Sequence, residues 1–145
     1  MNTPETKLQS AMSYAMEHRP AVGGFPFLAE CLRLAGVELN RWALPGAQSL
    51  YVMQDGVVVQ QGTPLVTGMH CVPEFDERAL VVALRKDQAG KSTFPEFLSA
   101  TWNAGVIGYE VDFSARTVTY SGARGESYSE SYPAVDVGEV QFRGS

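Results

Sequence analysis

The sequence predicts an α+β fold that is a tandem duplication of one unit, made of two helices and a three-stranded antiparallel meander. A thirteen-residue phrase occurs twice, as FPFLAECLRLAGV at 25–37 and as FPEFLSATWNAGV at 94–106. After each phrase, the spacing of apolar residues changes from helical to alternating. The length of 145 residues fits one compact domain, 1–145. We expect the helices to pack on one face of each sheet.

The duplication extends beyond the repeated phrase. Eleven positions between 4 and 66 carry the same residue 69 positions later, which is the spacing between Phe25 and Phe94. Random pairing at average residue usage would give about 4 such matches. Several matches are proline or glycine, the residues with the most distinctive backbone preferences. We therefore predict internal repeats at 4–66 and 73–135, followed by a short frayed tail at 138–145.

An amphipathic helix is expected at the start of each repeat. In the first repeat Thr3 is a suitable N-cap, and Pro4 suits the first helical turn. Apolar residues recur there at helical spacing, at Leu8, Ala11, Met12, Ala15 and Met16. The matching segment of the second repeat carries Phe75, Ala79, Leu80, Ala83 and Leu84. We expect both stripes to face the core.

The repeated phrase predicts a second, short helix with both ends defined. Thr93 and Glu96 have the spacing of a capping box, with a proline in the first turn. Gly36 and Gly105 stand where a left-handed residue commonly ends a helix. The residues expected to face the core are Phe25, Leu28, Leu32 and Ala35 in one copy, and Phe94, Phe97, Leu98 and Trp102 in the other.

The segments after each helix pair predict strands, because apolar and polar residues alternate there. In the first repeat we expect strands at 39–44, 50–53 and 57–60, with Asp55-Gly56 as a hairpin signal. In the second repeat the alternating apolar residues are Tyr109, Val111, Phe113, Val118 and Tyr120. The stretch ESYSESY predicts the last strand, and its polar character at 126–132 disfavours a continuous sheet between chains at that edge.

Composition narrows the classes of function. The formal net charge is −5 and the basic residues are scattered, so we expect no nucleic-acid partner. No apolar stretch approaches the length of a membrane span and the N-terminus lacks a signal-peptide pattern, so we expect no membrane partner and a cytoplasmic location. Two cysteines, Cys31 and Cys71, are too few for a disulfide framework.

The run FPEFLSATWNAGV, together with the later YEVDFSARTVTYSG, resembles an uncharacterised family of bacterial and prophage proteins. This YdfO/YbcV-like family is sometimes labelled "phage envelope protein". The resemblance covers most of the chain and is strongest from Phe94 to Pro133. It implies a small α+β protein and assigns no catalytic residue to this chain. The label "envelope" has no support in the residues, since the sequence contains no membrane segment or lipidation motif.

Two sets of residues have side chains suited to chemistry. His70 and Cys71 are adjacent, but neighbours in an extended segment point to opposite sides, and a zinc site needs about four ligands. We therefore expect no metal site and no cofactor. Glu110 and Asp112 lie on one face of an expected strand, where paired carboxylates either serve acid–base chemistry or face solvent. An enzyme that uses Glu110/Asp112 or His70/Cys71 is one alternative interpretation.

Aromatic side chains on the expected strands predict a binding groove between the two repeats, because Tyr and Trp suit surfaces that are partly apolar and partly wet. The alternative is that these rings fill the core. Arg41 matches Glu110 at the 69-residue offset, so the two should pair if the repeats are related by a two-fold axis. The candidate site residues are Trp42, Tyr51, Tyr109, Tyr120, Arg41, Glu110 and Asp112.

The function predicted from these observations is that of a non-enzymatic accessory protein. It would bind a small molecule or a protein partner through the groove between its repeats. Besides the enzyme described above, a second alternative is a prophage accessory factor that modulates a host protein through the sheet face or the tyrosine-rich edge. The prophage association in that alternative is implied by the family resemblance alone.

Overall fold

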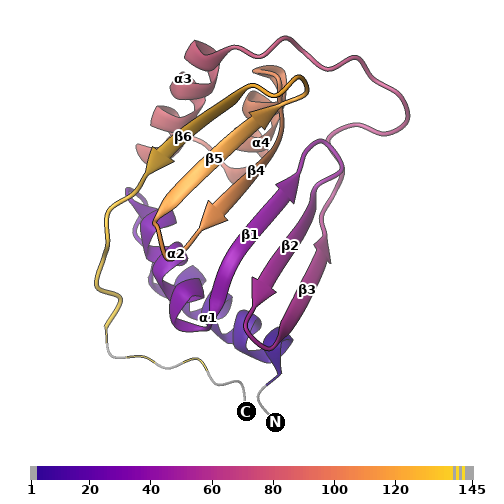
Figure 1. Cartoon of the computed structure of the whole chain (residues 1–145). Coiled ribbons are helices and arrows are strands. Elements are labelled where there is room, and N and C mark those ends of the chain that lie inside the picture. The colour runs from indigo at the N-terminus through magenta and orange to yellow at the C-terminus, as the bar shows by residue number, and fades with distance from the viewer. Residues whose placement is uncertain (1–2, 139, 141, 143–145) are drawn as a thin grey trace.

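The computed structural model describes residues 3–138, 140 and 142, and it confirms the α+β class (Figure 1). Within these residues the chain forms four helices and six strands. The first half contains α1 (Pro4–His18), α2 (Gly24–Leu34), β1 (Val37–Ala43), β2 (Gln48–Met53) and β3 (Gly56–Gln61). The second half contains α3 (Glu77–Gln88), α4 (Phe94–Asn103), β4 (Val106–Asp112), β5 (Thr117–Gly122) and β6 (Ser127–Ser131).

All six strands belong to one antiparallel sheet, in the order β3-β2-β1-β4-β5-β6. This differs from the expectation of a separate sheet in each half. β1 and β4 pair in the middle, with Leu39 opposite Asp112 and Ala43 opposite Gly108. Each meander alone would leave the N–H and C=O groups of β1 or β4 unpaired, and their pairing satisfies both. The seam between the two halves is therefore a hydrogen-bonded ladder.

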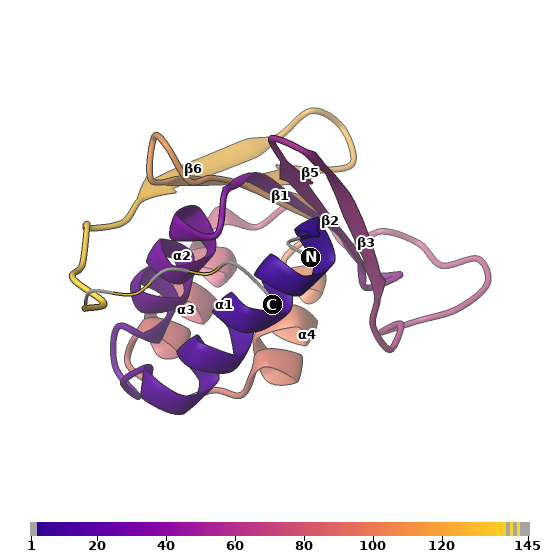
Figure 2. The ribbon, with the colours of Figure 1, turned by 90° about the horizontal axis from the view of Figure 1, so that it is seen from below.

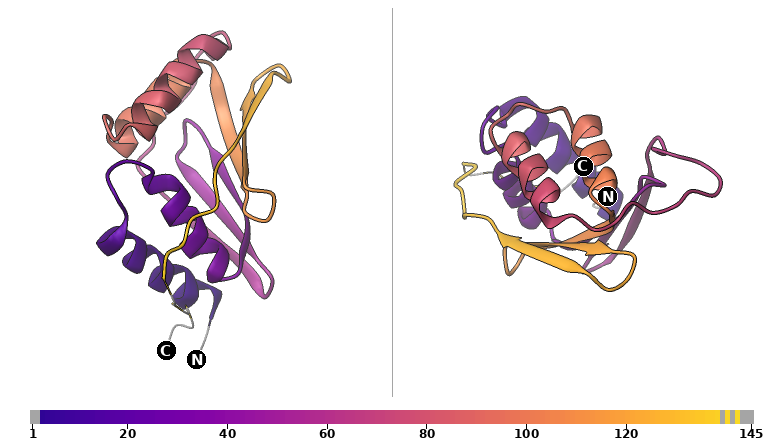
Figure 3. Two further views of the ribbon diagram at one scale, coloured as in Figure 1. Left: turned by 90° about the vertical axis from the view of Figure 1, so that its left-hand side faces the viewer. Right: turned by 90° about the horizontal axis from the view of Figure 1, so that it is seen from above.

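The helices cover one face of this sheet and leave the other face free of helices (Figure 2). They form two pairs, α1 with α2 and α3 with α4, which lie on the same side of the strands (Figure 3). We call the helix-free side the open face. None of the helices formed by the described residues is long and apolar enough to cross a membrane.

The predicted helix ends are confirmed. Thr3 caps α1 and forms a capping box with Thr6, and Thr93 caps α4 through a capping box with Glu96. The Glu96 carboxylate accepts the Thr93 N–H, while the Thr93 hydroxyl accepts the Glu96 N–H. Gly36 and Gly105 follow α2 and α4 with φ of +96° and +87°. These left-handed residues end the helices and turn the chain into β1 and β4.

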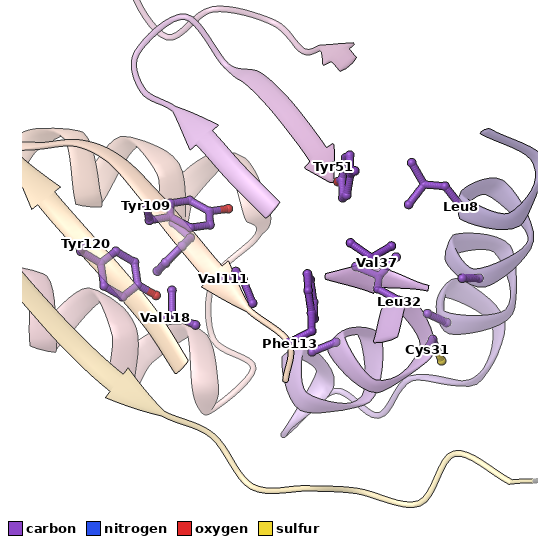
Figure 4. Close-up of a cluster of buried hydrophobic side chains, with 14 of the residues drawn as sticks. Leu8, Cys31, Leu32, Val37, Tyr51, Tyr109, Val111, Phe113, Val118 and Tyr120 are labelled. Atoms are coloured by element: carbon purple, nitrogen blue, oxygen red, sulfur yellow. The ribbon is translucent and has the colours of Figure 1, made fainter. Parts of the chain in front are cut away.

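The core lies between the helices and the inner face of the sheet (Figure 4). Leu8 and Leu32 from the helices meet Val37 and Val111 from the strands there. One residue of the predicted α1 stripe behaves differently: Met16 is 78% exposed. It follows buried Ala15 by one residue, which is a rotation of about 100° around the helix axis and away from the core.

Phe94 also differs from its predicted place in the core, because its side chain is 48% exposed. It lies in the first turn of α4, and its ring packs edge-on against Trp42 with 5.3 Å between centroids. The C-terminal segment also differs from its prediction. Within the expected frayed tail, Phe142 is buried and packs 5.6 Å from the Tyr14 ring. The Tyr14 hydroxyl donates to the Val137 carbonyl at 2.7 Å, so this segment is anchored to α1.

Candidate functional site

Three of the predicted site residues, Tyr51, Tyr109 and Tyr120, are buried on the inner face of the sheet (Figure 4). The rings of Tyr109 and Tyr120 are 5.5 Å apart, centroid to centroid. Burial is the main cause that raises the pKa of all three phenols. These side chains therefore belong to the core beneath the seam, which agrees with the alternative of core filling.

Trp42 occupies an intermediate place at the end of β1. Its ring stacks on Tyr109 at 6.1 Å on one side and meets Phe94 of α4 on the other. It is half-buried, and it also borders a hollow on the open face that is described below. The Trp42 ring therefore belongs to the aromatic cluster on the inner side of the sheet.

The three charged candidates lie on the open face rather than with the tyrosines. Arg41 and Glu110 stand opposite each other across the β1–β4 seam and form an ion pair, which confirms their predicted pairing. Both side chains are substantially exposed, at 59% and 41%. An exposed ion pair of this kind contributes at most about 1 kcal/mol to stability, so its main effect is to place a matched pair of charges at the centre of the face.

The carboxylates of Glu110 and Asp112 do not act on a common point. Asp112 Oδ1 accepts the backbone N–H groups of Ser114 and Ala115 at 3.1 and 3.0 Å, and so closes the turn after β4. Glu110 is engaged with Arg41. A general acid and base must both reach the same reacting group, and these two carboxylates instead serve a turn and an ion pair.

His70 and Cys71 lie in the exposed segment between β3 and α3. His70 Nε2 is 2.7 Å from the Thr67 carbonyl, a local contact within that segment. Across the part of the chain that the structure describes, no group of three or more His, Cys, Asp and Glu side chains is arranged to hold a metal ion. His70 and Cys71 lie between β3 and α3, whereas Glu110 and Asp112 lie on β4, so the structure does not gather the four residues into one site.

Two hollows on the surface of the described residues bear on the candidate site. The first, of about 340 Å³, lies where the β3–α3 segment passes the start of β4 and the end of α4, and its lining includes His70, Trp102 and Ile107. The second, of about 220 Å³, lies on the open face. It is lined by Arg41, Trp42, Ala43, Gln48, Leu50 and Val59. Two of the predicted site residues, Arg41 and Trp42, therefore border the same hollow.

The open face is divided in two at the seam. Residues that stand opposite each other on neighbouring strands share a face, so the register gives its rows directly. The central row runs Val59, Leu50, Arg41, Glu110, Thr119 and Ser129. The next row runs Val57, Val52, Leu39, Asp112, Thr117 and Ser131. In these two rows the half formed by β1–β3 is aliphatic apart from Arg41 at the seam, whereas the half formed by β4–β6 carries hydroxyl and carboxylate groups.

We call Leu39, Leu50, Val52, Val57 and Val59 the aliphatic patch. Val57 and Val59 are 57% and 60% exposed, and the other three are partly exposed. The sequence prediction missed these residues because it expected the helices to cover the apolar face of each sheet. The signal that could have found them is the run Val57-Val58-Val59, since alternation in a strand cannot place three consecutive valines on one side, so at least one of them must lie away from the helices.

This geometry defines the class of the protein. It is a small α+β protein with one sheet, which helices cover on one face, and with an open face that is half aliphatic. No family model matches the chain. Curated relatives include the uncharacterized proteins Rv2012 of Mycobacterium tuberculosis and Mb2035 of Mycobacterium bovis, each 53% identical over 136 residues. The match spans 94% of this chain and 83% of each relative. The chain belongs to the family of these mycobacterial proteins, whose names assign no activity.

Proposed function

We propose that this protein is a non-enzymatic binding module for a protein partner, and that the aliphatic patch on the open face is its binding surface. The observation that carries the proposal is the exposure of Val57 and Val59 beside the partly exposed Leu50 and Val52. Contiguous exposed apolar side chains with a polar border are typical of protein interaction sites. A cytoplasmic location and kinship with the YdfO/YbcV-like family belong to the same proposal, and they are supported by the sequence alone.

The shape of the open face favours a protein over a small molecule. The hollow beside Leu50 has a volume of about 220 Å³, below the range of roughly 300–1,000 Å³ that is usual for small-molecule sites. A single apolar side chain of a partner fits a hollow of this kind, while the rest of the partner covers the patch. Arg41 and Glu110 at its border supply one positive and one negative group to orient that partner.

A site-specific photocrosslinker at position 50 tests this function. A benzophenone amino acid replaces Leu50 in the aliphatic half, and in a matched control it replaces Thr119 in the polar half of the same face. Each variant is expressed and irradiated in the cells of its natural source. We expect a discrete adduct with another protein from position 50 and none from position 119. The same adduct from both positions, or no adduct from position 50, would overturn the proposal.

We also propose that the chain arose by tandem duplication of a helix–helix–meander unit, with repeats at 4–66 and 73–135. The bounds of β1 and β4, and those of β2 and β5, differ by the 69 residues of the sequence offset. Both hairpins have a register shift at the same place, at the start of β1 and of β4. The non-glycine residues with positive φ, Ala47 at 58° and Arg116 at 55°, are also 69 positions apart.

Contacts between equivalent residues further support the duplication. Arg41 pairs with Glu110, 69 positions later, on the sheet. In the helix layer Gly90 approaches Ala21, again 69 positions apart, so closely that a Cβ on Gly90 would lie 2.6 Å from the Ala21 carbonyl oxygen. Equivalent residues touch each other where two copies are related by a two-fold axis. In a crystal structure, 4–66 should superpose on 73–135 with all elements in order, and a failure to do so would refute the duplication.

A further inference from the structure

The two edges of the sheet differ in a way that bears on self-association. At one edge, β3 ends the sheet beside β2, and no other strand or helix of the described residues lies beyond it (Figure 1). Gly56 pairs with Met53 across a two-residue turn, so Gly56, Val58 and Gln60 direct their backbone groups toward β2. The N–H and C=O groups of Val57, Val59 and Gln61 therefore point outward.

These outward groups are available for pairing. Among the described residues, the backbone hydrogen bonds made outside helices and strands include none to Val57, Val59 or Gln61. Edge strands are commonly protected by a charge, a proline or a covering element, and β3 contains neither a charged residue nor a proline. Its nearest charge, Asp55, is held by Lys7 at 3.1 Å. β3 thus presents an uncharged, open edge of six residues.

The opposite edge, β6, is protected. The Glu130 carboxylate accepts from Arg85 of α3 at 2.5 and 3.0 Å and from Gln88 of α3 at 3.2 Å. The Tyr128 hydroxyl also donates to Glu130. These contacts draw side chains of α3 to the edge and place charge beside it, which discourages pairing with another chain. The contrast indicates that the sheet can be extended at β3 and not at β6.

We propose that two copies of this chain pair antiparallel through their β3 strands, so that two sheets join into one. With Val59 opposite its own counterpart, Val57 stands opposite Gln61 of the second copy, and all three outward-facing residues find partners. Neither β3 strand contains a charged side chain, so the two strands do not repel each other electrostatically when they pair. A two-fold axis perpendicular to the sheet relates the copies, so both open faces lie on one side and the two aliphatic patches become neighbours.

A second copy fits this edge better than an unrelated peptide, since the ladder is self-complementary over the whole length of the strand. The proposal is independent of the protein partner proposed for the open face, because it rests on backbone groups of β3 rather than on the patch. Edge pairing alone forms a small interface, and small interfaces are weak. We therefore expect a dimer that dissociates on dilution.

Matched proline variants of the full chain test the pairing by sedimentation velocity. Leu50 and Val59 form a non-hydrogen-bonded pair, so Val59→Pro removes an outward N–H without disturbing the ladder to β2. Ser129→Pro is the control, because Ser129 has the same relation to Thr119 at the β6 edge. We expect the unmodified chain and Ser129→Pro to double in mass with rising concentration, and Val59→Pro to remain monomeric. A monomeric unmodified chain, a dimeric Val59→Pro, or loss of the dimer in Ser129→Pro as well would overturn the proposal.

Cysteine crosslinking keeps the test decisive if a proline variant fails to fold. In a Cys71→Ser background, Val59→Cys places two thiols opposite each other, with about 5.5 Å between Cα atoms, which a disulfide can bridge. Val57→Cys places them about 14 Å apart in the same register. Mild oxidation should yield a covalent dimer from Val59→Cys and not from Val57→Cys. Equal yields, or no dimer from Val59→Cys, would exclude this pairing.

Discussion

At the scale of single residues, positions 69 apart in the chain can occupy matching buried places with side chains of different chemistry. Asn40 and Tyr109 are 69 positions apart and both lie buried on the inner face beside the seam. The Asn40 side chain donates to Ser49 Oγ at 2.8 Å and to the Leu50 carbonyl at 3.1 Å, so its buried amide is paired. Tyr109 fills the matching place with an aromatic ring stacked near Trp42. The first half therefore fills this place with the hydrogen-bonded pair Asn40 and Ser49, and the second half fills it with the aromatic ring of Tyr109.

The two cysteines are predicted to differ sharply in reactivity. Cys31 is buried and Cys71 is exposed. Burial raises the pKa of the Cys31 thiol from 9.0 to about 11. We expect a disulfide reagent to label one thiol in the native protein and both after denaturation. The Cys71→Ser variant should label only on unfolding. Fast labelling of native Cys71→Ser would contradict the burial of Cys31.

The same shift predicts a pH dependence of stability. The folded-state pKa of Cys31 lies above its unfolded value, so its contribution to stability is complete below about pH 9 and is lost as the pH rises toward 11. Burial also raises the pKa of Tyr132, to about 12. The free energy of unfolding should therefore fall above pH 9, and the fall should be smaller in Cys31→Ala than in the unmodified chain.

At the scale of elements, helix ends could be predicted well because a helix end depends on a few adjacent residues. The capping threonines Thr3 and Thr93 and both terminal glycines lie within the segments that they organise. Exposure was harder to predict. The stripe on α1 is correct for Leu8, Ala11 and Ala15 but not for Met16. Periodicity locates the centre of an apolar stripe, whereas its width depends on which neighbours cover the helix.

The two helix-terminating glycines form a matched pair for mutation. Both have positive φ, so alanine at either position costs about 1 kcal/mol of backbone strain. A Cβ on Gly36 would meet nothing within 4 Å, whereas on Gly105 it would lie 2.6 Å from the main chain of Glu74 and Phe75. We expect Gly105→Ala to lower the free energy of unfolding by at least about 1 kcal/mol more than Gly36→Ala does. Urea unfolding followed by circular dichroism measures the free energy of unfolding of both variants. Equal losses would contradict the close approach of the Glu74–Phe75 main chain to Gly105.

At the scale of the whole molecule, the continuous sheet makes the two halves one structural unit. Strands β1 and β4 share a ladder of five residue pairs, from Leu39–Asp112 to Ala43–Gly108. The core likewise contains residues from both halves, including Leu8 and Leu32 from the first and Leu80 and Phe113 from the second. Removing one half would expose both the ladder and this shared apolar surface.

Unfolding should therefore be a single cooperative transition. Trp42 lies on β1 in the first half and Trp102 on α4 in the second. In the Trp102→Phe variant, fluorescence reports on Trp42, and in the Trp42→Phe variant it reports on Trp102. We expect the fluorescence midpoint in urea to coincide with the circular dichroism midpoint within each variant. A Trp102 signal that changes well before the dichroism would show that the halves unfold separately.

The candidate site could be predicted only in part. Arg41 and Glu110 pair as their 69-residue spacing suggested, because equivalence along the chain was readable without knowing the sheet. The tyrosines at 51, 109 and 120 were assigned to the same groove, but they lie on the opposite face of the sheet from these charges. Alternation placed each strand residue on one of two sides, and it did not say which side the helices would cover.

The sequence by itself determined the helix ends, the strand segments, and the correspondence of positions 69 residues apart. These features depend on capping groups, glycine conformation and apolar periodicity, all of which act over a few neighbouring residues. Only the tertiary structure decided that β1 and β4 join two meanders into one sheet, that the aliphatic half of the open face stays exposed, and that β3 is left as an unprotected edge. Those outcomes depend on residues far apart in the chain, whose backbone groups and apolar surfaces are satisfied only when the whole sheet has formed.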